Sequence, residues 1–374
     1  MSKSKVVHFA PAFTSEGGGI FEVVNCLAYE QCKVHGDSNV IVLGCSDEAL
    51  AKVHSMPNDV VLDILPYRYS YVKFIQGFLK FKKILKDCDV LHVHGAWSLQ
   101  FLYLLPFILF NENCRLIYQP HGLLSSVRYK KNRFVKLLSW HLFMKFIVRR
   151  SSVVVSTSSI EEEEFIFSDE FSKKVICVPN AIATDFFDEP LKTRTDNNFL
   201  FLSQIIPIKG IDLLLRAFAR IIGEQHKVTL TIGGYGDSTY VQQLHKLVEE
   251  LNLYQYVNFI GPVARDDRIR IYDAHKFFIL PSKNESFGLV VGEALARGCI
   301  SFISERTPWA KIGDVPNLIT IRPEQKDIYN IIKSQLITNK QYLEQDAITS
   351  QNIIKKKYAW AEKLEQFSIL YAGP

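Results

Sequence analysis

Two carboxylates stand out because they flank the expected start of a helix. Glu285 and Glu293 lie within PSKNESFGLVVGEALARG (281–298), where a helix should begin near Phe287–Gly288. The first amides of a helix have no partner within it and bind anions, phosphates among them. Carboxylates beside such a point can accept hydrogen bonds from sugar or ribose hydroxyls. A surface helix is the alternative, but it leaves Glu293 unexplained within the apolar run Leu289–Leu295.

A lysine precedes a second expected helix. Lys209 and Gly210 stand in SQIIPIKGIDLLLRAF (203–218), directly before an amphipathic segment. A cation at a helix N-terminus is electrostatically unfavourable unless an anion occupies the same place. This motif therefore indicates either an anion site or, equally well, a solvated surface lysine.

A glycine triplet follows the first expected strand. Gly17, Gly18 and Gly19 in TSEGGGIFEVV lack Cβ atoms, so their backbone amides could approach a phosphate closely. A plain tight turn explains the triplet equally well, and the sequence is not the GxGxxG fingerprint of dinucleotide sites.

Three histidines lie at or near expected strand ends. His92 and His94 are two residues apart on a strand and therefore point to the same face. His121, within Pro-His-Gly, follows the next strand. A metal held by these three is considered, but we expect none, because no carboxylate or cysteine completes the set. His121 is expected to donate a hydrogen bond at the site instead.

The elements that must position these residues alternate between strand and helix throughout the chain. Short apolar runs predict the following buried parallel strands: 6–9, 40–43, 90–93, 115–119 and 153–156 in the first half, and 199–203, 228–233, 257–260, 277–280 and 300–304 in the second. The polar segment 182–198, which contains Pro190, is the expected linker. The fold class is therefore α/β, with two doubly wound Rossmann-like domains facing a central cleft, and ligands are expected at the carboxyl ends of the strands.

Composition fits a globular protein of about two domains. The 374 residues are 48% hydrophobic and 22% charged, which excludes disordered, collagen-like and disulfide-stapled classes. Seven cysteines without a CxxC pair indicate buried thiols in a reducing compartment. The N-terminal apolar run is too short for a signal peptide, so a cytoplasmic location is expected.

Positive charge is concentrated in residues 128–150. This window carries eight basic residues and no acid, whereas the whole chain has a net charge of +5. Basic residues that flank apolar and aromatic ones are typical of a helix lying on an anionic membrane. The expected membrane patch comprises Arg128, Lys130, Lys131, Arg133, Lys136 and Trp140. A domain helix with one solvated face is the alternative, and nucleic acid is not an expected partner because no binding module is recognisable.

The ordered set of motifs resembles the retaining GT-B glycosyltransferases of family 4. The resemblance rests on Glu285-x7-Glu293 within the 281–298 motif, together with GGG, DVxHxH, PHG, VPNA, KG and IGGYG in the family's order. It covers nearly the whole chain. HGAW and Thr307-Pro-Trp309 are similar to a branch that builds bacterial surface polysaccharides and lipopolysaccharide O-antigen.

The resemblance implies a nucleotide-sugar donor, expected to be a UDP-sugar, and transfer of its sugar with retention and without a metal or other cofactor. His121, Lys209 and Glu285 would be catalytic. The donor would be held by the following residues: Gly18, Gly19, Gln204, Lys209, Gly261, Val263, Glu285, Phe287, Gly288, Leu289 and Glu293. Lys209 would neutralise the diphosphate, Glu293 would hold the ribose, and Glu285 would hold the sugar. His121 would contact the sugar and the leaving phosphate.

The resemblance also implies domain roles and partners. Residues 1–182, with a returning helix at about 358–374, would bind the acceptor, and residues 197–357 would bind the donor. The acceptor would be a lipid-linked oligosaccharide at the inner face of the plasma membrane, where the protein would be peripheral.

Two departures from the family pattern bear on activity. Gln204 stands where an arginine is usual, so one of two diphosphate cations is missing unless Arg265 or Arg306 replaces it. Ile300 stands where proline is common, which should affect only local geometry. Gln204 otherwise leaves a slower enzyme, or an inactive homologue that binds without turnover and acts as a scaffold or partner. A nucleotide-sugar epimerase is a separate alternative in the same fold.

Overall fold

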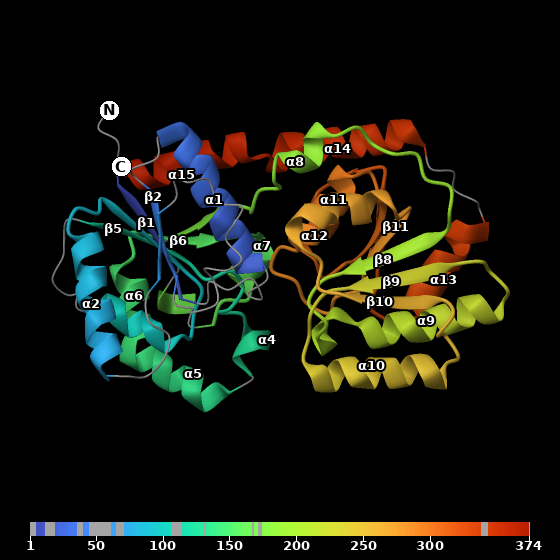
Figure 1. Cartoon of the computed structure of the whole chain (residues 1–374), viewed down its shortest axis with the longest axis horizontal. Helices are drawn as coiled ribbons and strands as arrows, with labels where there is room; N and C mark the ends of the chain where they lie inside the picture. The colour runs from blue at the N-terminus through green and yellow to red at the C-terminus, as the bar shows by residue number, and fades with distance from the viewer. Residues whose placement is uncertain are drawn as a thin grey trace. The chain divides into compact units, whose positions relative to one another are not determined.

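The chain forms two compact units, each built on one parallel sheet (Figure 1). The computed structural model describes residues 5–11, 19–35, 40–44, 61–64, 71–105, 114–130, 132–166, 168–170, 174–337 and 343–373. Unit 1 comprises Met1–Asn180 and Trp360–Pro374, and unit 2 comprises Ala181–Ala359. The expected α/β class, with two doubly wound domains, is confirmed.

The sheet of unit 1 has seven strands in the order β3-β2-β1-β4-β5-β6-β7. The strands are β1 (Val6–Ala10), β2 (Val40–Gly44), β3 (Val61–Ile64), β4 (Val90–His94), β5 (Arg115–Gln119), β6 (Val153–Ser156) and β7 (Val175–Cys177). One face of the central strands packs Val7, Phe9, Leu91 and Val93 into an apolar cluster with Phe81 and Phe101. Residues on the opposite face alternate with these, and His8 lies beside His92 in the register of β1 and β4.

Helices join the strands of unit 1 and cover the sheet. The α-helices are α1 (Gly19–His35), α2 (Tyr71–Leu85), α4 (Ser126–Tyr129), α5 (Arg133–Ser139), α6 (Lys145–Arg150), α7 (Ser159–Glu163) and α15 (Trp360–Ala372). Short 3₁₀ turns are η3 (Leu99–Tyr103) and η5 (Ser168–Glu170), and the π-helical turn η4 (Trp140–Met144) joins α5 to α6.

The sheet of unit 2 has six strands in the order β10-β9-β8-β11-β12-β13. The strands are β8 (Asn198–Leu202), β9 (Thr229–Gly233), β10 (Val257–Gly261), β11 (Phe277–Leu280), β12 (Ile300–Ser304) and β13 (Leu318–Ile321). The helices are α8 (Asp185–Asp188), α9 (Ile211–Gly223), α10 (Ser238–Glu250), α11 (Arg265–Asp273), α12 (Leu289–Ala296), α13 (Gln325–Ile337) and α14 (Glu344–Tyr358), with 3₁₀ turns η6 (Pro207–Lys209) and η7 (Pro308–Lys311). Helix α9 packs with α10 and α13, and α12 packs with α14.

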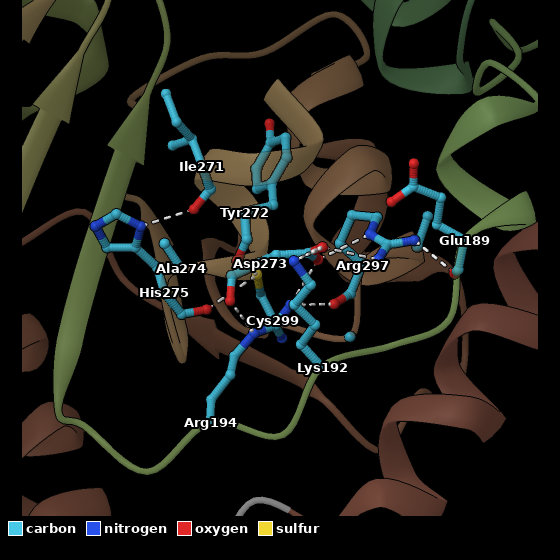
Figure 2. A network of polar contacts seen from close by, with 12 residues as sticks. Glu189, Lys192, Arg194, Ile271, Tyr272, Asp273, Ala274, His275, Arg297 and Cys299 are labelled. Atoms are coloured by element: carbon cyan, nitrogen blue, oxygen red, sulfur yellow. Dashed lines mark hydrogen bonds and ion pairs between the residues drawn. The ribbon is translucent and has the colours of Figure 1, made fainter. Parts of the chain in front are cut away.

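The segment 182–198, expected to be a linker, is tied firmly to unit 2. Arg297, fully buried, donates to the carbonyl oxygens of Phe186, Glu189 and Pro190 at 3.2, 2.8 and 3.0 Å (Figure 2). Its guanidinium also makes two 3.0 Å bonds to the buried Asp273 carboxylate. These bonds satisfy carbonyls that an irregular segment would otherwise leave unpaired. The segment 182–198 is therefore part of unit 2.

The C-terminal segment returns to unit 1, as the resemblance implies. Helix α14 ends at Tyr358, Ala359 has extended backbone, and α15 then begins at Trp360. Arg115 on β5 donates to the Leu370 carbonyl oxygen at 2.6 Å, which fixes α15 to the sheet of unit 1.

Within the part of the chain that the structure describes, no helix is both long and apolar enough to cross a membrane. Six cysteines in that part are free thiols: Cys26, Cys32, Cys88, Cys114, Cys177 and Cys299. Cys45 lies outside the described residues.

Candidate functional site

Lys209 and Glu285 form a buried ion pair in unit 2. Lys209 Nζ lies 2.5 and 2.7 Å from the two carboxylate oxygens of Glu285, and the two residues are only 6% and 8% exposed. Lys209 ends η6, and Gly210 then takes a left-handed φ of 71°. A Cβ at Gly210 would lie 2.5 Å from the Pro281 carbonyl oxygen, so only glycine allows the two loops to meet here. The Lys-Gly motif thus delivers the ammonium group to the Glu285 loop.

The start of α12 lies beside this pair. Gly288 precedes α12 with a left-handed φ of 81°, and a Cβ there would lie 3.0 Å from Glu285 Cγ. Trp309 Nε1 donates to the Gly288 carbonyl oxygen at 3.0 Å, and the buried Phe287 ring packs on the Trp309 ring. Leu289 is the first residue of the helix. The expected helix start and its carboxylate are therefore together, and Trp309 supports the turn.

Glu293 lies inside α12 and is 3% exposed. Its Oε1 accepts from Arg268 Nη1 at 3.0 Å, and its Oε2 accepts from the Tyr272 hydroxyl at 2.9 Å. Burial, with the Glu293 carboxylate nearby, raises the pKa of Tyr272, so the phenol stays protonated and donates.

The loops that follow β8, β9 and β10 meet at the carboxyl edge of the unit 2 sheet. Ile205 pairs with Gly236 across the first two loops, and a Cβ at Gly234 would lie 1.8 Å from the Ser203 carbonyl oxygen. The IGGYG motif therefore permits close backbone approach. Gln204 Nε2 donates to the Tyr235 hydroxyl at 2.6 Å. Gly234 N donates to the Gly261 carbonyl oxygen at 2.8 Å, which brings the third loop to the same edge.

Val263 also reaches this edge, because a Cβ at Gly233 would lie 3.2 Å from Val263 Cγ2. Both arginines considered as a substitute cation belong to unit 2. Arg265 pairs with Asp185 at 2.9 Å, and Arg306 is exposed. The side-chain amide of Gln204 bonds instead to the uncharged hydroxyl of Tyr235.

In unit 1, the Pro-His-Gly turn follows β5. His121 has a left-handed φ of 53°, and Gly122 follows with 74°. Gly122 N donates to the buried Glu161 carboxylate at 2.5 Å, and Thr157 N donates to the other Glu161 oxygen at 2.7 Å. Burial raises the pKa of Glu161. This buried acid on α7 holds the strained turn in place.

The glycine triplet lies partly outside the described residues. Gly17 and Gly18 fall outside them, and Gly19 is the first residue of α1. The next residue, Ile20, lies near Gly95 after β4, because a Cβ at Gly95 would be 4.0 Å from Ile20 Cδ1. The start of α1 is therefore beside the loop that carries the HGAW motif.

The buried histidines of unit 1 group differently from the set considered in the sequence. His8, His92 and His94 each bring one ring nitrogen within 4.8 Å of the others, a spacing that a metal ion could use. His121 contacts this group through His94, whose Nδ1 lies 2.9 Å from His121 Nε2. Burial lowers the pKa of all four, to about 4 for His8 and about 3 for His121, so they are neutral at pH 7.

The expected membrane patch needs one correction. Trp140 is 2% exposed and packs in the core of unit 1, because the π-helical turn at 140–144 directs it inward. Arg128, Lys130 and Arg133 are exposed, Lys136 is partly exposed, and Lys131 lies outside the described residues. Apolar side chains recur every four residues on the outer face instead: Phe134 (86% exposed), Leu138 (60%), Leu142 (54%) and Phe146 (46%).

Sequence reasoning missed four residues that the structure places beside the candidate residues. Arg268 and Tyr272 are four apart on α11, the spacing that puts two side chains on one helix face. His8 lies between Val7 and Phe9 on a strand, as His92 lies between two apolar residues. The strand alternation alone therefore predicted that the His8 side chain points to the face opposite to Val7 and Phe9. Glu161 follows the N-cap Ser158, a signal of helix start that carries no indication of burial.

Two α/β units, each built on one parallel sheet, are the architecture of the GT-B class. The chain is similar to the structure of Anabaena Alr3699/HepE in complex with UDP and glucose, with 17% identity, 99% of this chain and 100% of that chain covered, and a TM-score of 0.78. It is also similar to WaaG, a glycosyltransferase involved in lipopolysaccharide biosynthesis, with 14% identity, 99% and 100% covered, and a TM-score of 0.73.

Two glycosyltransferase family models match successive parts of the chain. Residues 17–186 match Glycosyltransferase Family 4, and residues 183–312 match Glycosyl transferases group 1. The gpi3 subunit of phosphatidylinositol N-acetylglucosaminyltransferase of Schizosaccharomyces pombe is 29% identical over 210 residues, which cover 53% of this chain and 43% of that protein. The matched part spans about half the length of the curated relatives, at 43% and 58%.

Proposed function

We propose that the protein transfers a sugar from a nucleotide-diphosphate sugar, most simply a UDP-sugar, to a lipid-linked glycan in surface-polysaccharide or O-antigen synthesis. Transfer retains the anomeric configuration and needs no metal. The two family-model matches support sugar transfer, and the likeness to a structure in complex with UDP supports the choice of nucleotide.

The observation that carries the proposal is the Lys209–Glu285 pair beside the start of α12. Departure of a diphosphate leaves negative charge, and fixed cations and helix amides stabilise that charge without reorganising. Lys209 is held rigidly for this task, since its ammonium group is bonded to both Glu285 oxygens. Glu285 lies next to Gly288 and can accept hydroxyl hydrogen bonds from the transferred sugar.

The direct test is binding followed by transfer. Thermal-shift screening against UDP-, GDP- and ADP-sugars should show one nucleotide that stabilises the chain. Transfer to a lipid-linked acceptor should then proceed in EDTA, and the product's anomeric proton should match the configuration of the donor. Binding of no nucleotide sugar would refute the function, and loss of transfer in EDTA would refute its metal independence.

Glu293 and Glu285 should differ in the kinetic constant that they control. Glu293→Ala is expected to raise the donor KM about tenfold, because ribose contacts are similar in the ground and transition states. Glu285→Ala is expected mainly to lower kcat, because Glu285 positions the reacting sugar. Steady-state kinetics with varied donor measures both, and Glu249→Ala, an exposed acid on α10, is the control. Wild-type constants for both variants would remove the paired acids from the site.

The outer face of residues 133–150 supports a membrane-bound acceptor. Phe134, Leu138, Leu142 and Phe146 form one exposed apolar stripe, and Lys130 and Arg133 lie at its N-terminal end. A helix with an apolar stripe and neighbouring basic residues binds the interface of an anionic bilayer. We therefore extend the proposal to a peripheral location on a cytoplasmic membrane face.

Membrane binding should need both the apolar stripe and the basic residues at its N-terminal end. A Lys130→Glu/Arg133→Glu variant should lose affinity for phosphatidylserine vesicles, since each basic residue contributes about 1 kcal/mol near such a surface. Phe134→Ser/Leu138→Ser should lose it as well, through reduced apolar burial. Vesicle co-sedimentation measures binding, and Tyr254→Ser, which alters an exposed aromatic residue of unit 2, is the control. A wild-type chain that ignores anionic vesicles at low salt would contradict the membrane proposal.

One observation favours a second function, a nucleotide-sugar-binding partner without transferase activity. Gln204 is neutral, is bonded to Tyr235, and stands where the family usually has an arginine. A chain of this kind would bind the donor and leave it intact with every acceptor. An epimerase, the other alternative, would convert the donor without an acceptor, which nuclear magnetic resonance of the donor alone would show.

A further inference from the structure

A continuous row of hydrogen bonds runs behind His121 through the interior of unit 1. His121 Nε2 lies 2.9 Å from His94 Nδ1, and His94 Nε2 lies 3.0 Å from His8 Nδ1. His8 Nε2 lies 2.7 Å from Gln31 Oε1 on α1. Gln31 Nε2 in turn donates to the Tyr371 hydroxyl on α15 at 2.9 Å. The row therefore links the strained turn after β5 to two helices distant in sequence.

The amide of Gln31 gives every bond in this row a direction. Its nitrogen faces Tyr371, so its oxygen faces His8 and must accept a proton from His8 Nε2. A neutral imidazole carries one proton, so His8 Nδ1 accepts from His94 Nε2. By the same rule His94 Nδ1 accepts from His121 Nε2. Burial lowers the pKa of each histidine, which keeps one proton on each ring at pH 7.

The hydroxyl of Tyr371 continues the row beyond that amide. Its oxygen accepts from Gln31 Nε2, and its proton points to His92 Nδ1 at 2.9 Å. Burial raises the pKa of Tyr371, so the hydroxyl keeps its proton. His92 then carries its proton on Nε2, which has no hydrogen-bond partner among the described residues. A reversed Gln31 would reverse every bond in the row.

We propose that Tyr371, Gln31, His8 and His94 act as positioning residues that hold His121 in its Nε2–H tautomer. The other ring nitrogen, Nδ1, is then a hydrogen-bond acceptor. An acceptor binds a hydroxyl group and is repelled by an unprotonated phosphate, so His121 recognises a sugar hydroxyl and not the diphosphate. The nature of this ligand rests on the proposed function, but the tautomer does not. The inference replaces the expectation that His121 donates a hydrogen bond or contacts the leaving phosphate.

The test measures the tautomer directly in the full chain. Nitrogen-15 spectra of histidine-labelled protein at pH 7 distinguish protonated from unprotonated ring nitrogens, and loss of signals in His121→Asn identifies those of His121. We expect Nε2 of His121 to be protonated and Nδ1 to be bare. Tyr371→Phe and Gln31→Met should both mix the two tautomers of His121 and lower kcat about tenfold, with the donor KM nearly unchanged.

Two variants separate this role from simple packing. Gln31→Glu keeps an acceptor beside His8 Nε2 and should restore the Nε2–H tautomer that Gln31→Met loses. Phe367→Leu alters the α15 side chain that packs on the His92 ring and makes no hydrogen bond, so it should leave the His121 signals as in the wild type. If Tyr371→Phe does not fold, Gln31→Met tests the same step from α1.

Several outcomes would overturn the inference. A proton on His121 Nδ1 in the wild type would do so, and so would unchanged His121 signals in the folded Gln31→Met variant. Stoichiometric zinc on His8, His92 and His94 in the purified chain would as well, since metal-bound nitrogens cannot bond to one another. If no transfer is detected but the spectra show the expected tautomer, the tautomer inference stands and the transferase proposal fails. If transfer is detected but Nδ1 of His121 is protonated, only the tautomer inference fails.

Discussion

Lys209→Ala is expected to lower kcat/KM at least about tenfold and to weaken nucleotide-sugar binding. The change removes the cation assigned to the diphosphate, and Gln204 offers no second charge. It also leaves the Glu285 carboxylate buried without its partner, since the two side chains are 8% and 10% exposed. Loss of one member of a buried ion pair costs about 3–5 kcal/mol of folding free energy. Kinetics and thermal unfolding should therefore change together.

A double variant separates these two effects. Lys209→Met/Glu285→Gln removes both charges at similar volume and should recover most of the stability while activity stays low. Lys246→Ala, which removes an exposed lysine of α10, should change neither. Unaltered kinetics in Lys209→Ala would end the diphosphate assignment, whatever its effect on stability.

Arg297→Ala is expected to destabilise the protein by about 3–5 kcal/mol, without any direct part in binding. The side chain makes two bonds to Asp273 and one to each of three carbonyls in the 186–190 segment (Figure 2). Arg194 would remain near Asp273, with its Nη2 at 3.3 Å from the carboxylate, and could replace only part of the lost charge. The three carbonyls would also lose the donor that the fully buried Arg297 supplies.

Differential scanning calorimetry of the full chain measures this loss as a lower unfolding temperature. Arg297→Lys should give an intermediate value, because an ammonium group cannot make the paired contact with Asp273. Arg270→Ala, which removes an arginine that is 78% exposed and paired with Asp267, should cost at most about 1 kcal/mol. A similar melting temperature for Arg297→Ala and the wild type would show that the segment does not depend on this anchor.

Most strands that the sequence predicted lie inside a sheet, and the edge strand β10 is the exception. Runs such as 153–156 and 277–280 read as continuous apolar segments, and the structure places both as strands with the same bounds. The strands that were missed lie at sheet edges: β3, β7 and β13. Val175–Cys177 is largely exposed and only three residues long, so it lacks the pattern that marks a central strand.

The residues of the candidate site were predicted better than their partners. Lys209, Glu285 and the start of α12 were predictable because short motifs fix them locally. That Lys209 pairs with Glu285, and Glu293 with Arg268, depends on contacts between residues 76 and 25 positions apart, which no local pattern encodes. Trp140 was misplaced because a regular helical period does not anticipate the π-helical turn at 140–144.

The return of α15 to unit 1 has a consequence for the order in which the protein matures on the ribosome. Residues 181–359 are continuous in sequence, so unit 2 can close as soon as they have emerged. Unit 1 begins to emerge first, yet the acceptor for Arg115 and the hydroxyl for Gln31 and His92 come from Leu370 and Tyr371. During synthesis, unit 1 therefore lacks α15 and its hydrogen bonds until all of unit 2 has been made. It is made first and finished last.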